Sequence, residues 1–486
     1  MIADRAPFDR FEASLATGDV LSALREGLIG EGAPVPGPFG VHPLVYADYI
    51  ASGRSLRQVE DFILEHVLPY YANSHTEASF CGMYMTRTRE AARRIIADQC
   101  RATDDYATIF VGSGATAGIN RLVELLGVGS AAREGTSRPV VFIGPYEHHS
   151  NILPWRESGA EIVAIAEAAQ GGPDLDVLEA ALRAAGPERL KVGAFSAASN
   201  VTGVMTDVDA VSAVLRRHGA AVVWDYAGGG PYLSVDMRAG TEFQKDAIVI
   251  SPHKFLGGPG ASGVLIVRRQ AVTLDRPVCP GGGTVRFVSP WGHDYSVNVV
   301  SREESGTPNV IGDIRAALAF LVKDAIGQSR MDSRHAQLRE RALQYWRRND
   351  RIEILGNSAA AHSLPIFSIR VRGERGEGFV HQQLFTRMLS DRYGVQARGG
   401  CACAGPYAHD LLGIGREHSV VLRNSILSGD EIEKPGWTRL NLSVLLTDQK
   451  AQFIIGAVDE LARDATEIAA LYHCDKSTAR FTPLAG

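Results

Sequence analysis

Short apolar runs alternate with amphipathic stretches between residues 105 and 267, and this alternation determines the expected fold. Each run is four to six residues long and is bounded by polar or glycine-rich segments, as is typical of buried strands. The intervening stretches, such as 118–126, 174–185 and 207–217, place apolar residues at helical spacing. The predicted strands are 107–111, 139–143, 161–165, 191–196, 221–225, 247–250 and 262–267. Repeated strand-then-helix units predict an α/β fold with a mainly parallel seven-stranded sheet.

The segments on either side of this region have a different pattern. Residues 8–28 have helical periodicity and lead into a Gly/Pro-rich segment, which predicts an N-terminal arm and linker over 1–40. After Asn309 a long helical segment begins. Further helices are predicted at 333–347 and 447–471, and strands at 366–371 and 437–443. We therefore expect a large domain over 41–320 and a smaller α+β domain over 321–486.

Composition excludes several classes of protein. The 486-residue chain has a net charge of −5 and no lysine/arginine run, so binding to nucleic acid has no electrostatic support. No apolar stretch is long enough to span a membrane, and the N-terminus lacks the order of a signal peptide. Six cysteines without framework spacing indicate a reducing compartment. We expect a cytoplasmic enzyme with no nucleic-acid or membrane partner.

Lys254 and Asp225 each lie at the end of a predicted strand, where ligands bind in parallel sheets. A buried lysine amine loses its proton readily and can form a Schiff base. A carboxylate such as Asp225 can keep the nitrogen of a pyridinium ring protonated. Alone, either residue is ordinarily a surface lysine or a helix-capping aspartate. Together with the motifs below, the two favour a pyridoxal phosphate (PLP) enzyme.

A glycine-rich segment, 112–120, follows a strand and opens a helix. The free N–H groups and the dipole at a helix start favour a phosphate, and glycine lets the backbone approach it. Such turns are usually structural when they occur alone. Thr116, Ser251 and His253 can supply side-chain donors to the same phosphate, which strengthens the interpretation.

Two adjacent histidines, His148 and His149, follow another strand. Adjacent side chains diverge, so a shared metal is not expected, and one imidazole stacked on a pyridine ring fits better. A solvated loop pair is the ordinary alternative. Asn200 lies in an Asn/Ser turn after the 191–196 strand, where it is either turn chemistry or an amide aimed at a cofactor oxygen.

The segment 398–406 reads Arg-Gly-Gly-Cys-Ala-Cys-Ala-Gly-Pro and contains Cys401 and Cys403. The glycines and Arg398 favour an exposed, reactive thiolate, whereas a buried structural cysteine is the commoner alternative. Zinc bound by both cysteines and His409 is a minor option. Arg439 lies within an alternating strand, where it can bind a substrate carboxylate or form a structural ion pair.

In this order, the motifs resemble those of the class V aminotransferase superfamily of fold-type I PLP enzymes. Within it, the chain is most similar to group II cysteine desulfurases and selenocysteine lyases. The resemblance covers residues 46–443 and is strongest in EHHSNILPW, SAASNVTGV, SPHKFLGGPGASGVL, GTPN and RGGCACAGP. It implies the PLP-dependent transferase fold of type I, with PLP as cofactor and no metal.

The resemblance also implies a role for each matched residue. Lys254 would hold the cofactor covalently and move a proton, and Cys403 would be the nucleophile, with His148 as the third catalytic residue. Cofactor contacts would come from Lys254, Asp225, His148, Thr116, Ala115, Asn200, Ser251, His253 and Thr307. Asn200, Arg398 and Arg439 would orient the substrate. Thr307 would reach the other subunit's site in a homodimer.

The expected reaction converts L-cysteine to L-alanine with a persulfide on Cys403, and a protein sulfur acceptor is an expected partner. Gly228 stands where the family has a glutamine, and Cys401 where it has a histidine. An alternative is therefore a class V lyase or epimerase acting on another amino-acid derivative, such as selenocysteine or a cysteine conjugate. A third hypothesis is a catalytically silent sulfur carrier or scaffold, which Lys254 and Asp225 argue against.

Overall fold

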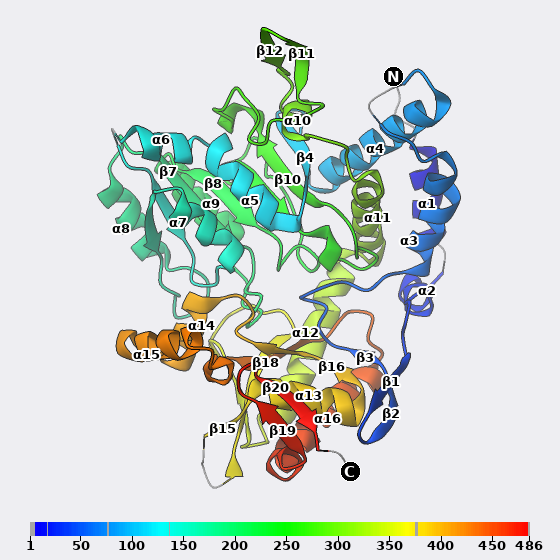
Figure 1. The fold of residues 1–486 in the computed structure, drawn as a ribbon, viewed down its shortest axis with the longest axis vertical. Helices are drawn as coiled ribbons and strands as arrows, with labels where there is room; N and C mark the ends of the chain where they lie inside the picture. Colours follow the sequence, from blue (N-terminus) through cyan, green and yellow to red (C-terminus); the bar gives the residue numbers. More distant parts are fainter. Residues whose placement is uncertain (1–4, 17, 75–76, 136, 375–377, 485–486) are drawn as a thin grey trace.

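The computed structural model describes residues 5–16, 18–74, 77–135, 137–374 and 378–484 (Figure 1). A seven-stranded sheet with the order β4–β10–β9–β8–β7–β5–β6 fills the larger part of the molecule. Its strands are β4 (Tyr106–Gly112), β5 (Val140–Ile143), β6 (Glu161–Ala164), β7 (Lys191–Ser196), β8 (Ala221–Asp225), β9 (Ala247–Ile250) and β10 (Gly263–Arg268). All seven predicted strands are confirmed, and each end lies within one residue of its expected position.

The sheet is mainly parallel, as predicted. β6, β5, β7, β8 and β9 pair in parallel, whereas β10 runs antiparallel to both β9 and β4. Asp225 pairs with Ser196 on one side and Val249 on the other, so β7, β8 and β9 end level with one another. Most strand residues are buried on both faces, which explains why these strands appear as continuous apolar runs.

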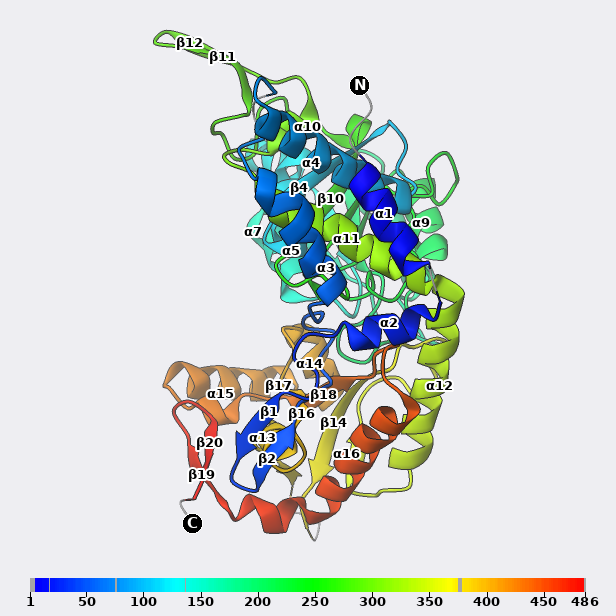
Figure 2. The same ribbon diagram turned by 90° about the vertical axis from the view of Figure 1, so that its right-hand side faces the viewer.

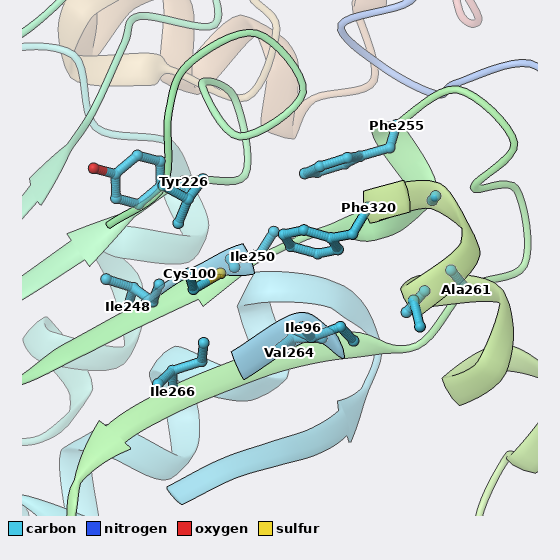
Figure 3. Packing of buried hydrophobic residues seen from close by; sticks show 14 of the residues in the cluster. Ile96, Cys100, Tyr226, Ile248, Ile250, Phe255, Ala261, Val264, Ile266 and Phe320 are labelled. Atoms are coloured by element: carbon cyan, nitrogen blue, oxygen red, sulfur yellow. The ribbon is translucent and has the colours of Figure 1, made fainter. Parts of the chain in front are cut away.

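Helices cover both faces of this sheet. The helices of this part are α4 (Phe80–Gln99), α5 (Gly114–Leu125), α6 (Val128–Glu134), α7 (Leu153–Glu157), α8 (Leu175–Ala185), α9 (Val208–Arg217), α10 (Val299–Glu303) and α11 (Val310–Ile326). Apolar residues of α5, α6 and α7 pack on one face, and those of α4, α8, α9 and α11 pack on the other. On the face covered by α4 and α11, Phe255 and Phe320 have ring centroids 4.9 Å apart and lie above Ile250 (Figure 3).

The C-terminal part contains its own sheet and its own apolar cluster (Figure 1). Its strands are β13 (Ile352–Ile354), β14 (Ile366–Arg372), β15 (Phe379–Val380), β17 (Arg398–Gly400) and β18 (Trp437–Asn441), all paired antiparallel. Its helices are α12 (Gln328–Trp346), α13 (Gln382–Tyr393), α14 (Gly405–Leu412), α15 (Arg416–Leu427) and α16 (Asp448–Ala469). The strands predicted at 366–371 and 437–443 are thus present, while the domain boundaries at residues 40 and 320 stay predictions.

The N-terminal arm differs from a simple linker. Helices α1 (Ala6–Leu15) and α2 (Val20–Glu26) contact α11, and β1 (Pro34–Gly37) and β2 (Gly40–Pro43) form a hairpin beside α13. The remaining elements are α3 (Arg57–Phe62), β3 (Val45–Tyr46), β16 (Val395–Gln396), the hairpins β11 (Val285–Ser289)–β12 (Gly292–Tyr295) and β19 (Tyr472–Asp475)–β20 (Arg480–Pro483), and the short turns η1 (Ile63–Val67), η2 (Leu68–Tyr70), η3 (His149–Asn151), η4 (Pro252–Lys254), η5 (Arg269–Ala271) and η7 (Glu431–Glu433). None of the described helices is long and apolar enough to cross a membrane.

A buried ion cluster connects α4 to α11 and to the end of α10. Glu304 accepts hydrogen bonds from Arg89 Nη2 and Arg93 Nη1, each at 2.6 Å, and from the Phe110 amide at 2.7 Å. Arg89 also binds Asp313 at 2.6 Å. Burial alone raises the pKa of Glu304, but the two guanidinium groups lower it below its usual value. Because buried charges are tolerated only when paired, this cluster stabilises the folded state through all of its members together.

Replacing Glu304 with glutamine removes the buried carboxylate that Arg89 and Arg93 share, and leaves them only Asp313 and the more exposed Glu90 as counter-charges. We expect the free energy of unfolding to fall by about 3–5 kcal/mol, measured by urea denaturation followed by circular dichroism. The matched control is Glu124→Gln, which breaks the exposed pair with Arg133 at 2.8 Å and costs less than about 1 kcal/mol. Equal losses in the two variants would contradict the stabilising role of the cluster.

Candidate active site

A cavity of about 210 Å³ lies at the carboxyl ends of the large sheet's parallel strands. The segments that follow β4, β5, β7, β8 and β9 line one side of it, and the β17–β18 region lines the other. The predicted site residues in its lining are Ala115, Thr116, His148, Asn200, Asp225, Ser251, His253, Lys254, Arg398, Cys403 and Arg439. Thr307 lies elsewhere, exposed between α10 and α11. Residues from distant parts of the sequence thus meet in one place, and their individual roles remain predictions.

The N-terminus of α5 forms one end of the cavity. Gly114 has a φ of +62°, and a Cβ atom there would lie 2.9 Å from Ser251 Oγ, so the turn needs glycine. Ser251 Oγ accepts a hydrogen bond from the Ala115 amide at 2.9 Å. Burial, and then the charge of Lys254, lower the pKa of His253 to about 4, so its imidazole is neutral near pH 7. Amide groups of a helix start beside neutral donors form a suitable site for a phosphate.

Lys254 and Asp225 both line the cavity and can carry opposite charges. Asp225 ends β8, is 3% exposed, and accepts a hydrogen bond from the Ala227 amide at 2.7 Å. Burial raises the pKa of Asp225, although Ala227 and Lys254 oppose the shift. The pKa of Lys254 is lowered to about 8: burial is the main cause, Asp225 opposes the shift, and Arg439 and Arg398 add to it. The amine is therefore far more often neutral, and hence nucleophilic, near pH 7 than an ordinary lysine amine.

His148 also lines the cavity and is held by a short chain of hydroxyl groups. Its Nδ1 lies 3.0 Å from Ser150 Oγ, which in turn lies 2.7 Å from Thr116 Oγ1. Burial, followed by the charge of Lys254, lowers the pKa of His148 to about 4. Behind it, buried Glu147 accepts hydrogen bonds from the amide and hydroxyl of Ser196, at 2.9 and 2.6 Å. These contacts hold the neutral imidazole ring of His148 with one face toward the cavity.

Arg398 and Arg439 occupy paired positions on β17 and β18 and share one carboxylate. Asp48 binds Arg439 Nη2 at 2.9 Å and Arg398 Nε at 3.0 Å. Arg439 is buried and also donates to the Asn200 carbonyl at 3.2 Å, whereas the Arg398 side chain is 52% exposed. Among the described residues, Arg439 Nε and Asn200 Oδ1 are buried without a hydrogen-bond partner. A carboxylate ligand would therefore share these arginines with Asp48.

Cys403 lies in a turn beside these arginines. It is exposed and lines the cavity, whereas Cys401 is half-buried and packs against an apolar cluster that includes Trp437. The His409 ring nitrogens are hydrogen-bonded to the Gly405 carbonyl and the Ser419 hydroxyl, each at 2.8 Å. Within the described parts of the chain, no group of three or more His, Cys, Asp or Glu side chains is arranged to hold a metal ion, so the zinc option has no structural basis.

Three contributors were not predicted from the sequence: Asp48, Ser150 and Glu147. A signal existed for Asp48, because a single acidic residue within the apolar segment 45–50 indicates a buried carboxylate that needs a partner. Ser150 and Glu147 follow a strand in a polar loop, where nothing distinguishes them from solvent-exposed residues.

Comparison with known proteins identifies a family. The model of the family described as Aminotransferase class-V matches residues 45–430. A probable cysteine desulfurase of Vibrio cholerae is 30% identical over 369 residues, covering 75% of this chain and 85% of the relative. A probable cysteine desulfurase 2 of Mycobacterium leprae is 30% identical over 375 residues, covering 76% and 84%.

Solved structures show the same fold. The apo cysteine desulfurase of Thermococcus onnurineus superposes with a TM-score of 0.71 at 23% identity, covering 86% of this chain and 95% of that one. The cysteine desulfurase CsdA of Escherichia coli, in its S-sulfonic acid form, gives 0.69 at 22% identity, covering 92% and 98%. The expected α/β fold with its two sheets is therefore confirmed.

The lowered pKa of Lys254 can be measured directly. In protein freed of small molecules, reductive methylation at Lys254 should be half-maximal near pH 8, because the neutral amine reacts. The control is the urea-unfolded protein, in which the Lys254 amine is exposed to solvent and should react only at higher pH. Asp225→Asn removes the negative charge that raises the pKa of Lys254, so its midpoint should fall further. Identical midpoints for Lys254 in the folded and unfolded protein, read by peptide mass spectrometry, would refute the assignment.

Proposed function

The chain belongs to the class-V aminotransferase family, and from this premise we propose that it is a PLP-dependent cysteine desulfurase. It converts L-cysteine to L-alanine and retains the sulfur as a persulfide on Cys403. The single observation that carries the proposal is that the Cys403 thiol lines the same cavity as Lys254 and Asp225. The names of the relatives support the same reaction.

The residues of the cavity fit PLP. The α5 N-terminus, Ser251 and His253 would hold the phosphate, and Asp225 would pair with the ring nitrogen. Asn200 Oδ1, buried without a partner among the described residues, is available to a polar group of the cofactor or substrate. When bound, PLP supplies an electron sink that makes the substrate's Cα proton acidic and allows its C–S bond to break.

The protein's own groups supply the rest of the chemistry. Arg398 and Arg439 bind the substrate carboxylate and fix its orientation. The Lys254 amine would take the Cα proton. The Cys403 thiolate attacks the substrate sulfur, so an S–S bond forms as the C–S bond breaks. The electron pair of the broken bond stays on Cβ, which takes up a proton, Lys254 returns a proton to Cα, and alanine leaves. A sulfur acceptor then receives the outer sulfur atom of the persulfide from Cys403.

A second candidate is a lyase or epimerase acting on selenocysteine or a cysteine conjugate. Gly228 lines the cavity without a side chain, at the position where the resemblance led us to expect a glutamine. The cofactor contact that the glutamine would make is therefore absent or made by another group. This change affects substrate choice more than cofactor binding, because Lys254 and Asp225 are in place.

We also propose a cytoplasmic homodimer. The β11–β12 hairpin projects from the large sheet (Figure 2) and exposes Phe287, Val288 and Trp291, the last at 92%. The base of the hairpin is joined to the Thr307 segment, since the Gly306 amide donates to the Gly282 carbonyl at 2.8 Å. A second copy of the chain would cover these apolar side chains and receive Thr307 at its phosphate site.

Cys403→Ala is expected to abolish alanine formation from L-cysteine, because Cys403 is the one cysteine among the described residues that line the cavity. The protein should keep the visible absorbance of bound PLP, which Lys254→Ala should lose. Cys401→Ala is the matched control and should keep most of the activity. Undiminished alanine release by Cys403→Ala would refute the nucleophile assignment.

A substrate panel separates the two candidate functions. The desulfurase proposal predicts that kcat/KM for L-cysteine exceeds that for selenocysteine, cysteine conjugates and other amino acids. Equal or higher values for another amino acid would favour the second candidate. A purified protein without cofactor absorbance would instead revive the non-catalytic carrier.

The dimer has its own test. Light scattering coupled to size-exclusion chromatography should give twice the chain mass of 52.3 kDa. Trp291→Ser combined with Phe287→Ser should shift the protein toward monomer, while Thr307→Ala should stay dimeric and bind PLP more weakly. A monomeric wild-type protein at micromolar concentration would overturn the proposal.

A further inference from the structure

The turn that carries Cys403 has an unfavourable backbone conformation. Residues 401–404, here called the Cys403 turn, are closed by a hydrogen bond from the Ala404 amide to the Cys401 carbonyl at 3.2 Å. Ala402 and Cys403 have φ angles of +53° and +56°. Left-handed backbone costs about 1–2 kcal/mol per residue that has a Cβ atom. Such a turn persists only where the surroundings hold it in place.

His149 contacts this turn through its backbone and the residue directly after the turn through its ring. Its backbone amide donates to the Cys403 carbonyl at 2.8 Å, and its ring Nε2 accepts from the Gly405 amide at 2.8 Å. Gly405 begins α14, whose first N–H groups have no partner within the helix. The imidazole therefore satisfies the first helix amide while the preceding residues adopt the strained turn. A third contact, from Asn200 Nδ2 to the Ala402 carbonyl at 3.0 Å, lies on the cavity side.

The two adjacent histidines thus have different surroundings. His148 lines the cavity, whereas the His149 ring accepts a hydrogen bond from Gly405, the residue directly after the Cys403 turn. Nε2 can accept a hydrogen bond only in the neutral ring with its proton on Nδ1. Burial, followed by the charge of Arg156, lowers the pKa of His149 and so favours that neutral form.

We propose that His149 is a positioning residue, which fixes the Cys403 turn so that the thiol faces a substrate bound in the cavity. This inference rests on the proposed function, in which Cys403 is the nucleophile. It assigns the second histidine of the pair to the geometry of the thiol. Misplacement of a reacting atom by about 1 Å can reduce a rate up to a hundredfold.

The test compares two variants at position 149 in the PLP-bound protein. His149→Phe keeps a planar ring without an acceptor, and His149→Gln places an amide oxygen near the position of Nε2. His381→Ala is the matched control, because it removes an imidazole that also accepts from a helix amide, that of Gln383, while its other ring nitrogen lies beside the Ile432 carbonyl, away from the Cys403 turn and Gly405. Visible absorbance and the melting temperature check cofactor binding and folding in each variant.

The first measurement does not depend on the substrate. Hydrogen exchange in the peptide 401–412 should be at least about fivefold faster in His149→Phe at the turn and at Gly405. It should be near wild type in His149→Gln and, at the same amides, in His381→Ala. Unchanged exchange in His149→Phe would overturn the proposal, even if the protein proved to act on another substrate.

The second measurement is the rate of alanine formation. In His149→Phe, kcat should fall ten- to a hundredfold with KM for L-cysteine little changed, and His149→Gln should recover most of the loss. Faster exchange with an unaltered kcat would show that the contact is only structural and would overturn the proposal. If the wild-type protein forms no alanine, the proposed function fails, and the exchange result still decides whether His149 holds the turn.

Discussion

When neighbouring parallel strands end at the same level, the residues that follow them lie side by side at one edge of the sheet. Asp225, Ser196 and Val249 are register partners at the ends of three neighbouring strands, so the segments after them emerge along a single line. The sheet is buried on both faces, and the carboxyl ends of its strands are where polar side chains can gather around a ligand. The cavity, the depressed pKa of Lys254 and the position of its partner Asp225 all depend on this alignment.

The other side of the cavity comes from the smaller antiparallel sheet, and charge pairing joins the two sides. Asp48 lies just after β3 and binds two arginines on neighbouring strands of that sheet. Arg439 in turn donates to the carbonyl of Asn200, which lies in the turn after β7 of the large sheet. Since a buried guanidinium is costly without partners, these contacts hold the two sheets in one arrangement around the cavity.

The large sheet was predictable because strands buried on both faces must be apolar throughout, and each such run is visible in the sequence. The site residues were predictable where they directly follow a strand, as Lys254 and Asp225 do. The segment 34–43 was expected as part of a linker, because a hairpin held by backbone pairing needs no apolar pattern. Asp48 was missed because its partners are 350 and 391 residues away in the sequence.

Asp48 also determines how many negative charges this part of the cavity can accommodate. One carboxylate and two guanidinium groups leave a local charge of +1, with most of the remaining donors on the half-exposed Arg398. A ligand with one carboxylate brings this trio to neutrality. A ligand with two carboxylates at the same place leaves an excess negative charge in a poorly solvated space. If Arg398 and Arg439 bind the substrate carboxylate as we propose, the trio favours monocarboxylic ligands over dicarboxylic ligands of similar size.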